Sequence, residues 1–268
     1  MNKRTILYFL IFSAIAAGCS KTAEVAPEKV PDDTQLKTLF AVAPKMCINK
    51  IIDADGKKTN GVVLKNNRWP ESKKVIRVKF LNGDSYLQGK VMTYAGKWSL
   101  YGNVTFVKES VASKSDIRVA FKFDGDEGSW SYIGSDAQYI DKAEPTMNFG
   151  WFDSKTSEEE FSRVIIHEVG HAIGLAHEQA SPGVNIKWNK NNVYWYYQRP
   201  PNSWTKAQID YNIFFKYTAA DAYYSPFDPI SIMQYPVDPR FTTDGKTIGW
   251  NTVLSPIDKI VASRLFPK

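Results

Sequence analysis

All three histidines of this 268-residue chain lie within eleven residues, in the stretch HEVGHAIGLAHE at positions 167–178. On a helix, His167 and His171 point the same way, because positions four apart are neighbours on one face. Both ring nitrogens can then reach a single ion at about 2.0–2.1 Å. Gly174 allows the helix to end in a left-handed conformation, and this turn returns His177 toward the same ion as a third ligand. Three protein ligands and one open position are typical of a catalytic zinc site.

Glu168 follows the first of these histidines and lies at the edge of the same cleft. Its carboxylate can hydrogen-bond a metal-bound water without binding the metal itself. The alternative interpretation is an amphipathic helix that carries histidines by coincidence. A His-Glu-x-x-His string alone recurs by chance, but the longer string with Gly174 and His177 uses every histidine of the chain, which favours the metal site.

The surrounding sequence predicts helices packed on a twisted sheet. The histidine helix is expected to begin at Ser157, because Glu160 three residues later completes a capping-box pattern. A closing helix is expected from Ser255, with a proline at its first position and Asp258 at its third. An earlier helix, capped by Asp84, is expected from Ser85 to about Trp98. Strands are expected at 75–80, 103–107, 116–121, 130–134 and 146–150. This order of elements is typical of a mixed α/β or an α+β fold.

The N-terminus has the pattern of an export signal. Lys3 and Arg4 precede an apolar run at 6–17, which is too short to cross a bilayer comfortably. The run leads into Cys19 through small residues and resembles a bacterial lipobox, in which the cysteine is lipidated and becomes the mature N-terminus. The alternative is an ordinary cleaved signal with an incidental cysteine. We therefore expect a lipoprotein signal peptide at 1–19. The protein is expected to be exported and lipid-anchored to a bacterial membrane, at the outer membrane or the cell surface, or else secreted.

Charge and cysteine content exclude two classes of protein. Residues 66–268 carry 24 Lys and Arg against 22 Asp and Glu. A nearly neutral body of this kind lacks the basic stripe that nucleic-acid binding needs, so we expect no nucleic-acid partner. If Cys19 carries lipid, Cys47 is the one remaining thiol, and an internal disulfide framework is excluded.

The histidine stretch matches the metzincin metalloprotease signature, and SIMQY at 231–235 fits the Met-turn that this signature predicts. Within the metzincins the chain resembles the astacins most closely. Glu178 follows the third histidine, and Tyr235 lies two residues after Met233, as in that family. Similar stretches are RWP at 68–70, GSWSYIG at 128–134, HEQASP at 177–182 and LSPIDK at 254–259. The resemblance covers roughly residues 67–268.

The resemblance implies an α+β metzincin fold. A twisted mixed sheet and the active-site helix would form an upper subdomain, and an irregular lower subdomain would hold the Met-turn and the C-terminal helix. Residues 20–66 are then a tether and prosegment, and residues 67–268 the catalytic domain. Three features depart from the family: the catalytic domain has no cysteine, Gln234 replaces a common histidine, and the prosegment lacks a clean Phe-x-Gly-Asp motif.

The same resemblance implies roles for individual residues. One catalytic Zn²⁺ would be held by the three histidines, with Tyr235 as a further ligand at rest that swings away to stabilise the oxyanion. The alternative for Tyr235 is a structural phenol behind the site. Met233 would form an apolar floor beneath the histidines, and Glu178 would meet the newly cleaved N-terminus after processing. The stretch TMNFG at 146–150 resembles the edge strand to which metzincins add the substrate.

Two residues carry further hypotheses. Cys47 could bind the zinc as a latency switch, because a thiolate is a good zinc ligand. The alternative is a buried apolar thiol within a prosegment. Arg240 follows the Met-turn and could favour acidic residues just after the cleaved bond.

We therefore predict a hydrolase, a zinc-dependent metalloendopeptidase that acts on peptides or proteins and is made as a latent zymogen. A metal-activated water would attack the peptide bond, with Glu168 as general base and then acid. The competing interpretation is a catalytically inactive, metal-stabilised surface binding or adhesion module. A non-enzyme of that kind would need neither Glu168 nor Tyr235.

Overall fold

The computed structural model describes residues 45–50 and 63–268, which all belong to the second of two units, Phe40–Lys268. The predicted signal peptide with Cys19, and most of the predicted tether and prosegment, lie outside the described residues. None of the described helices combines the length and the apolar composition needed to span a bilayer.

A six-stranded sheet forms one layer of this unit, with the strand order β1-β6-β7-β5-β3-β4. Its strands are β1 (Ile48–Lys50), β3 (Val75–Phe80), β4 (Thr105–Lys108), β5 (Ile117–Ala120), β6 (Ser129–Tyr132) and β7 (Met147–Phe149). β6 runs antiparallel to β7, and every other neighbouring pair in this sheet is parallel. A second sheet pairs β2 (Val63–Leu64) with β8 (Ala222–Tyr223).

The prediction that residues 146–150 form the edge strand is wrong. β7 (Met147–Phe149) lies between β5 and β6, and all three of its residues are buried. β6 is the outer strand of the predicted catalytic domain, and β1 from the predicted prosegment pairs along it. The two strands are similarly short, so the pattern of side chains within each could not decide which one lies outside.

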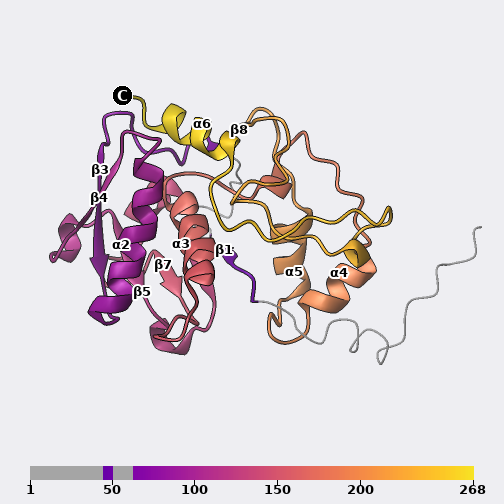
Figure 1. Cartoon of the computed structure of the whole chain (residues 1–268), viewed down its shortest axis with the longest axis horizontal. Coiled ribbons are helices and arrows are strands. Elements are labelled where there is room, and N and C mark those ends of the chain that lie inside the picture. The colour runs from indigo at the N-terminus through magenta and orange to yellow at the C-terminus, as the bar shows by residue number, and fades with distance from the viewer. Residues whose placement is uncertain (1–44, 51–62) are drawn as a thin grey trace, which may run out of the picture. The chain divides into compact units, whose positions relative to one another are not determined.

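Helices α2 (Ser85–Ser99) and α3 (Glu158–Ala172) lie side by side against the sheet (Figure 1). The indole Nε1 of Trp98 donates to the carbonyl of Ile166 at 3.0 Å, which ties the two helices together. Asp84 caps α2 by accepting from Leu87, as the sequence predicts. These helices and the inner face of the sheet enclose the larger hydrophobic core.

The predicted capping box of α3 forms only in part. The Ser157 side chain accepts from the backbone N–H of Glu160 at 3.2 Å. The Glu160 carboxylate instead binds the indole of Trp151 and the guanidinium of Arg163. Trp151 follows β7, and Arg163 lies one turn further along α3. Together they offer the Glu160 side chain stronger hydrogen-bond donors than a single backbone N–H, and this draws it away from the cap.

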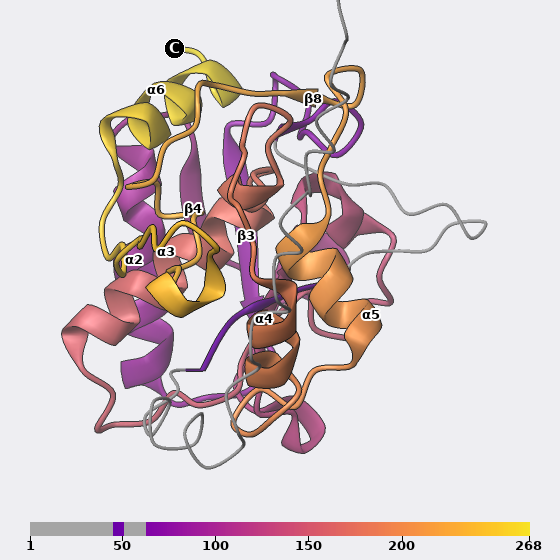
Figure 2. The same ribbon diagram turned by 90° about the vertical axis from the view of Figure 1, so that its right-hand side faces the viewer.

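The second half of the unit is mostly irregular chain. Its helices are α4 (Lys190–Tyr197), α5 (Lys206–Ile209), a π-helical turn at Asp210–Phe214 and α6 (Pro256–Leu265). Figures 1 and 2 show α4 and α5 well apart from α2 and α3, with α6 returning to the side of the sheet. An aromatic-rich core formed by α4, α5 and the chain near Phe241 holds this half together. The arrangement confirms the predicted α+β class.

Candidate metal centre

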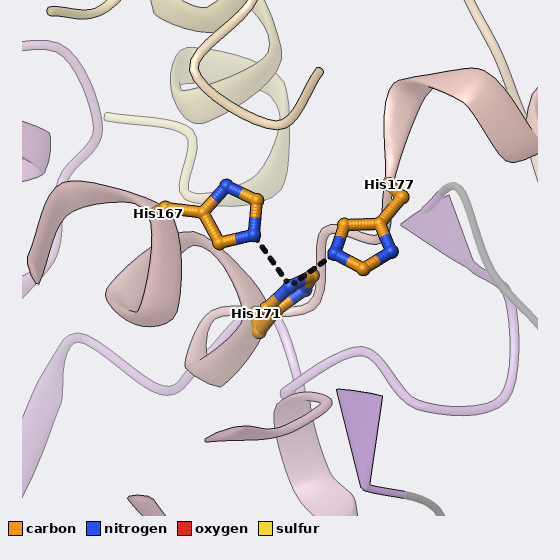
Figure 3. Close-up of side chains that lie close together, drawn as sticks. All are labelled: His167, His171 and His177. Atoms are coloured by element: carbon orange, nitrogen blue, oxygen red, sulfur yellow. Dashed lines mark hydrogen bonds between the residues drawn. The ribbon is translucent and has the colours of Figure 1, made fainter. Parts of the chain in front are cut away.

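The three histidines converge on one point between the two halves of the unit. The Nε2 atom of His171 lies 3.1 Å from Nε2 of His167 and 3.3 Å from Nε2 of His177 (Figure 3). A tetrahedral zinc ion with nitrogen ligands at 2.0–2.1 Å separates those ligands by about 3.3 Å. The spacing of the three nitrogens therefore fits one zinc ion.

Backbone carbonyls set the proton positions on two of these rings. Nδ1 of His167 lies 2.8 Å from the carbonyl oxygen of Ile232. Nδ1 of His171 lies 2.8 Å from the carbonyl oxygen of Leu175. A carbonyl only accepts, so each Nδ1 carries the proton and each Nε2 presents a lone pair.

Burial keeps the three rings neutral. It lowers the pKa of His167 to about 4, and it lowers the pKa of His171 and of His177 well below the usual value. Neutral rings whose lone pairs face one another repel unless a cation lies between them. The donor set and its protonation thus match what zinc requires of imidazole ligands.

Gly174 turns the chain back toward the metal ligands, as predicted. Its φ is +112°, in the region that favours glycine. Its N–H donates to the carbonyl of His171 at 2.8 Å, and the N–H of Leu175 donates to the carbonyl of Gly170 at 2.9 Å. These bonds end the helix and place His177 beside the other two rings.

The Met-turn lies directly beneath the active-site helix. Met233 is buried, and a Cβ placed on Gly170 would lie 2.4 Å from its Sδ atom. The absence of a side chain at Gly170 is what lets Met233 approach the helix between the two ligands His167 and His171. The carbonyl of Met233 also accepts from the backbone N–H of Glu178 at 3.0 Å.

Asp258 holds the Met-turn in place, a role that could not be predicted from the sequence. Helix α6 begins at Pro256 after Ser255, as predicted, and Ser255 and Asp258 cap it reciprocally. The carboxylate of Asp258 also accepts from the Ser231 hydroxyl at 2.7 Å and from the Ile232 N–H at 2.8 Å. Because the Ile232 carbonyl in turn binds His167, α6 positions a metal ligand through two hydrogen bonds.

Glu168 is fully buried beside the histidines. Neither of its carboxylate oxygens has a hydrogen-bond partner of good geometry within the described part of the chain. Burial raises its pKa to about 8, and the neighbouring Cys47 thiol opposes this rise. A carboxylate held in this way is suited to accept a proton from a reacting group at the metal.

Two further predicted site residues meet at the same place. The Sγ of Cys47, a ring nitrogen of His167 and a carboxylate oxygen of Glu168 all lie within 4.8 Å of one another. The hydroxyl of Tyr235 donates to the backbone carbonyl of Cys47, and its ring centroid lies 4.1 Å from that of His177. The phenol thus faces the backbone of the predicted prosegment at the edge of the histidine cluster.

Glu178 and Arg240 lie outside this cluster. One carboxylate oxygen of Glu178 accepts from the N–H of Asp228 at 3.0 Å, and burial raises the pKa of Glu178 to about 7. The guanidinium of Arg240 binds the carboxylate of Asp238 through two nitrogens. An arginine neutralised in this way gives little support to the hypothesis that it selects acidic substrates.

Solved structures of known proteins are similar to this chain. The structure of myroilysin is similar to this chain with a TM-score of 0.72 and 44% sequence identity, over 78% of this chain and 99% of myroilysin. A second structure of myroilysin matches with a TM-score of 0.57 and 40% identity, over 84% of this chain and 100% of the other. The chain belongs to the astacin-like metzincin family of zinc metallopeptidases.

More distant proteins agree with this family. High choriolytic enzyme 1, a hatching-enzyme zinc protease from Oryzias latipes (medaka), shares the fold with a TM-score of 0.50 and 17% identity, over 75% of this chain and 94% of that protein. Matrix metalloproteinase-2 from Drosophila melanogaster is 27% identical over 143 residues. That match covers 47% of this chain, which spans only 17% of the length of that relative. No protein-family model matches the chain.

The family and the three-histidine site together confirm the predicted metzincin fold and one catalytic zinc ion. They also confirm that the chain is a zinc-dependent endopeptidase acting on peptide or protein substrates.

Proposed function

We propose that this endopeptidase is made as a latent precursor whose prosegment, within residues 20–66, fills the active-site cleft, and that residues 67–268 form the catalytic domain. The observation that carries the proposal is the course of residues 45–50. Met46 is buried in the core of the second half, and Cys47 is buried in the core that includes α3. Ile48–Lys50 then pair along β6. A chain lodged in both halves and along the outer strand leaves no room for a substrate in the same place.

The chemistry assigns Glu168 to proton transfer. When bound by the three histidines, zinc supplies a Lewis acid that polarises the peptide carbonyl and makes water acidic near pH 7. Glu168 accepts the proton of the attacking water and delivers it to the leaving amine. Its place supports this role, because the carboxylate is buried next to His167 and neither of its oxygens has a hydrogen-bond partner of good geometry in the described part of the chain.

We assign Tyr235 to the substrate carbonyl. In the precursor its hydroxyl donates to the peptide carbonyl of Cys47, next to the metal ligands. The carbonyl of a bound substrate would occupy a similar place once the prosegment has left. A phenol already aimed at a peptide oxygen there is suited to stabilise the negative charge that develops on it.

Cys47 is the proposed latency ligand. Its thiol is buried next to His167 and Glu168, and burial raises the pKa of this thiol well above the usual value. Coordination of the thiol to a zinc ion held by the histidines would reverse that effect, because a coordinating thiol loses its proton. Cys47 would thus close the open position that catalysis requires.

Zinc X-ray absorption on the full-length precursor tests this assignment. Zinc–sulfur and zinc–nitrogen distances differ, at about 2.3 Å and about 2.0–2.1 Å. We expect one sulfur ligand in the wild-type precursor and none in Cys47→Ala. Cys47→Ser should show no sulfur ligand either. A wild-type spectrum with only nitrogen and oxygen ligands would remove the role.

We also propose export and lipid anchoring through Cys19. The support is the charged start, the short apolar run at 6–17 and the small residues before the cysteine. Cys19→Ser should move the protein from the membrane fraction to the soluble exported fraction. Retention of the variant in the membrane fraction, at the wild-type level, would refute the anchor.

A further inference from the structure

A cavity of about 390 Å³ opens beside the metal centre. The cavity is lined by Lys45, Trp151, Ser157, Glu159, Glu160, Arg163, Trp250 and Thr252. Arg163 also lines the small pocket around His167 and Cys47, so the cavity continues the cleft that holds the metal ligands. Nothing in the chemistry assigned to the metal centre uses this cavity.

The arginine in its wall is already satisfied. Arg163 binds the Glu160 carboxylate through Nε at 2.8 Å and through a terminal nitrogen at 2.6 Å. Its guanidinium also lies 4.3 Å from the ring centroid of Trp250. The same carboxylate accepts from the indole of Trp151 at 2.9 Å. Arg163 and Glu160 therefore form a rigid, neutral part of the wall, and Arg163 is not free to bind an anion.

A positively charged residue of the chain itself lies in this cavity. The ammonium of Lys45 lies 5.7 Å from the ring centroid of Trp151, within the range of a cation–π contact. Lys45 also contributes to the lowered pKa of Glu127, behind the larger effect of Lys122. Glu127 lies next to Trp151, because a Cβ on Gly150 would lie 2.1 Å from its carbonyl carbon.

Departure of the prosegment would leave this cavity with a net negative charge. With Lys45 gone, Glu160 and Arg163 cancel, and Glu159 has no ion pair within the described part of the chain. The exposed face of Trp151 would also lose its cation. An aromatic face beside an unpaired carboxylate favours a lysine or arginine side chain, whose apolar stem can lie on the ring.

We propose that this cavity is a substrate subsite for a basic side chain, which Lys45 fills in the precursor. The inference rests on the proposed removal of the prosegment. Lys45 lies two residues before Cys47, the residue at the metal, and β1 runs parallel to β6. Antiparallel pairing is the more stable arrangement of two strands, so a substrate that pairs with β6 runs in the direction opposite to β1. A basic substrate residue in the place of Lys45 therefore lies on the C-terminal side of the cleaved bond, nearest to the second position after it.

The test uses the full chain after limited proteolysis and pairs of peptides that differ at one position. Lysine, norleucine or glutamate is placed at each of the first three positions after the cleaved bond. We expect kcat/KM for the lysine peptide to exceed that of the norleucine peptide roughly tenfold at one of these positions. The glutamate peptide should be cleaved slowest. In Trp151→Leu and Glu159→Gln the ratio of the lysine-peptide rate to the norleucine-peptide rate should fall to about threefold or less.

Matched variants separate this subsite from general charge effects. Glu109→Gln makes the same chemical change after β4, at the opposite edge of the sheet, and should keep the full preference. Arg240→Ala should keep it as well. Equal rates for lysine and norleucine peptides at all three positions would overturn the proposal. If the trimmed chain cleaves neither peptide, the proposed activation is wrong. Calorimetry with trimmed Glu168→Ala then decides the subsite: tighter binding of the lysine peptide supports it, and equal affinities overturn it.

Discussion

Glu168 combines two properties that rarely occur together, full burial and a carboxylate without a hydrogen-bond partner of good geometry in the described structure. A buried charge without partners is costly. The proposed proton transfer at the metal gives a reason for keeping a carboxyl group in this place. The same physical effect, desolvation, acts on the neighbouring histidines in the opposite sense and keeps them neutral for metal binding.

Desolvation also acts on a carboxylate outside the histidine cluster. Burial raises the pKa of Asp136 to about 6 from its ordinary value of 3.8, and Asn67 partly opposes this rise. The folded state therefore binds the proton more tightly than the unfolded state. The stability that this provides is present below about pH 4 and is lost as the pH rises through about 6.

Asp136→Asn should remove this pH dependence. Because the residue is partly exposed, we expect the variant to gain about 1 kcal/mol relative to wild type at pH 7.5 and little at pH 4.5. Urea unfolding of both proteins at the two pH values measures the difference. Asp244→Asn on an exposed turn is the control. A gain for Asp136→Asn that is equal at the two pH values would contradict the assignment.

At the scale of elements, α3 and the Met-turn work as one unit. The helix carries two ligands, Met233 packs between them, and Asp258 at the start of α6 holds the turn in place. The contact between helix and turn depends on the missing side chain of Gly170. A small change in the helix should therefore affect zinc binding without touching a ligand.

Gly170→Ala tests this contact. Its Cβ would lie 2.4 Å from Sδ of Met233 and 3.1 Å from Trp98, so the Met-turn has to move. We expect a loss of about 1–2 kcal/mol in the free energy of unfolding, after allowing for alanine's higher helix propensity, and weaker zinc binding. Gly89→Ala in α2, where nothing lies within 4 Å, should instead be neutral or stabilising. Equal effects of the two substitutions would show that Met233 does not depend on this contact.

The sequence predicts those parts of the elements that depend on local contacts. The caps at Asp84 and Ser157, the left-handed Gly174 and the facing histidines all follow from spacing along one chain segment. The outer position of β6 and the second role of Asp258 depend on contacts between distant segments. No periodicity in a strand of three or four residues reports which neighbour it will have. The pairing of Glu160 with Trp151 could not be predicted for the same reason.

At the scale of the whole molecule, the active-site cleft lies between a sheet-and-helix half and an irregular, aromatic half. Residues 45–50 contribute to both cores and to the sheet. A single segment therefore accounts for the proposed blocking of zinc by Cys47, of the substrate strand by β1 and of a subsite by Lys45. Removing the segment would open all three sites together.

The most direct test of this account compares the full-length protein before and after limited proteolysis, with Glu168→Ala beside it. Bound zinc and the cleavage of a generic protein substrate are measured in each form. We expect about one zinc per chain throughout, and activity that appears only after trimming and is lost with a chelator. Glu168→Ala should lose at least a hundredfold in rate while retaining zinc. Full zinc occupancy without cleavage in any trimmed form would contradict the account, and the histidines would then serve a structural or binding role alone.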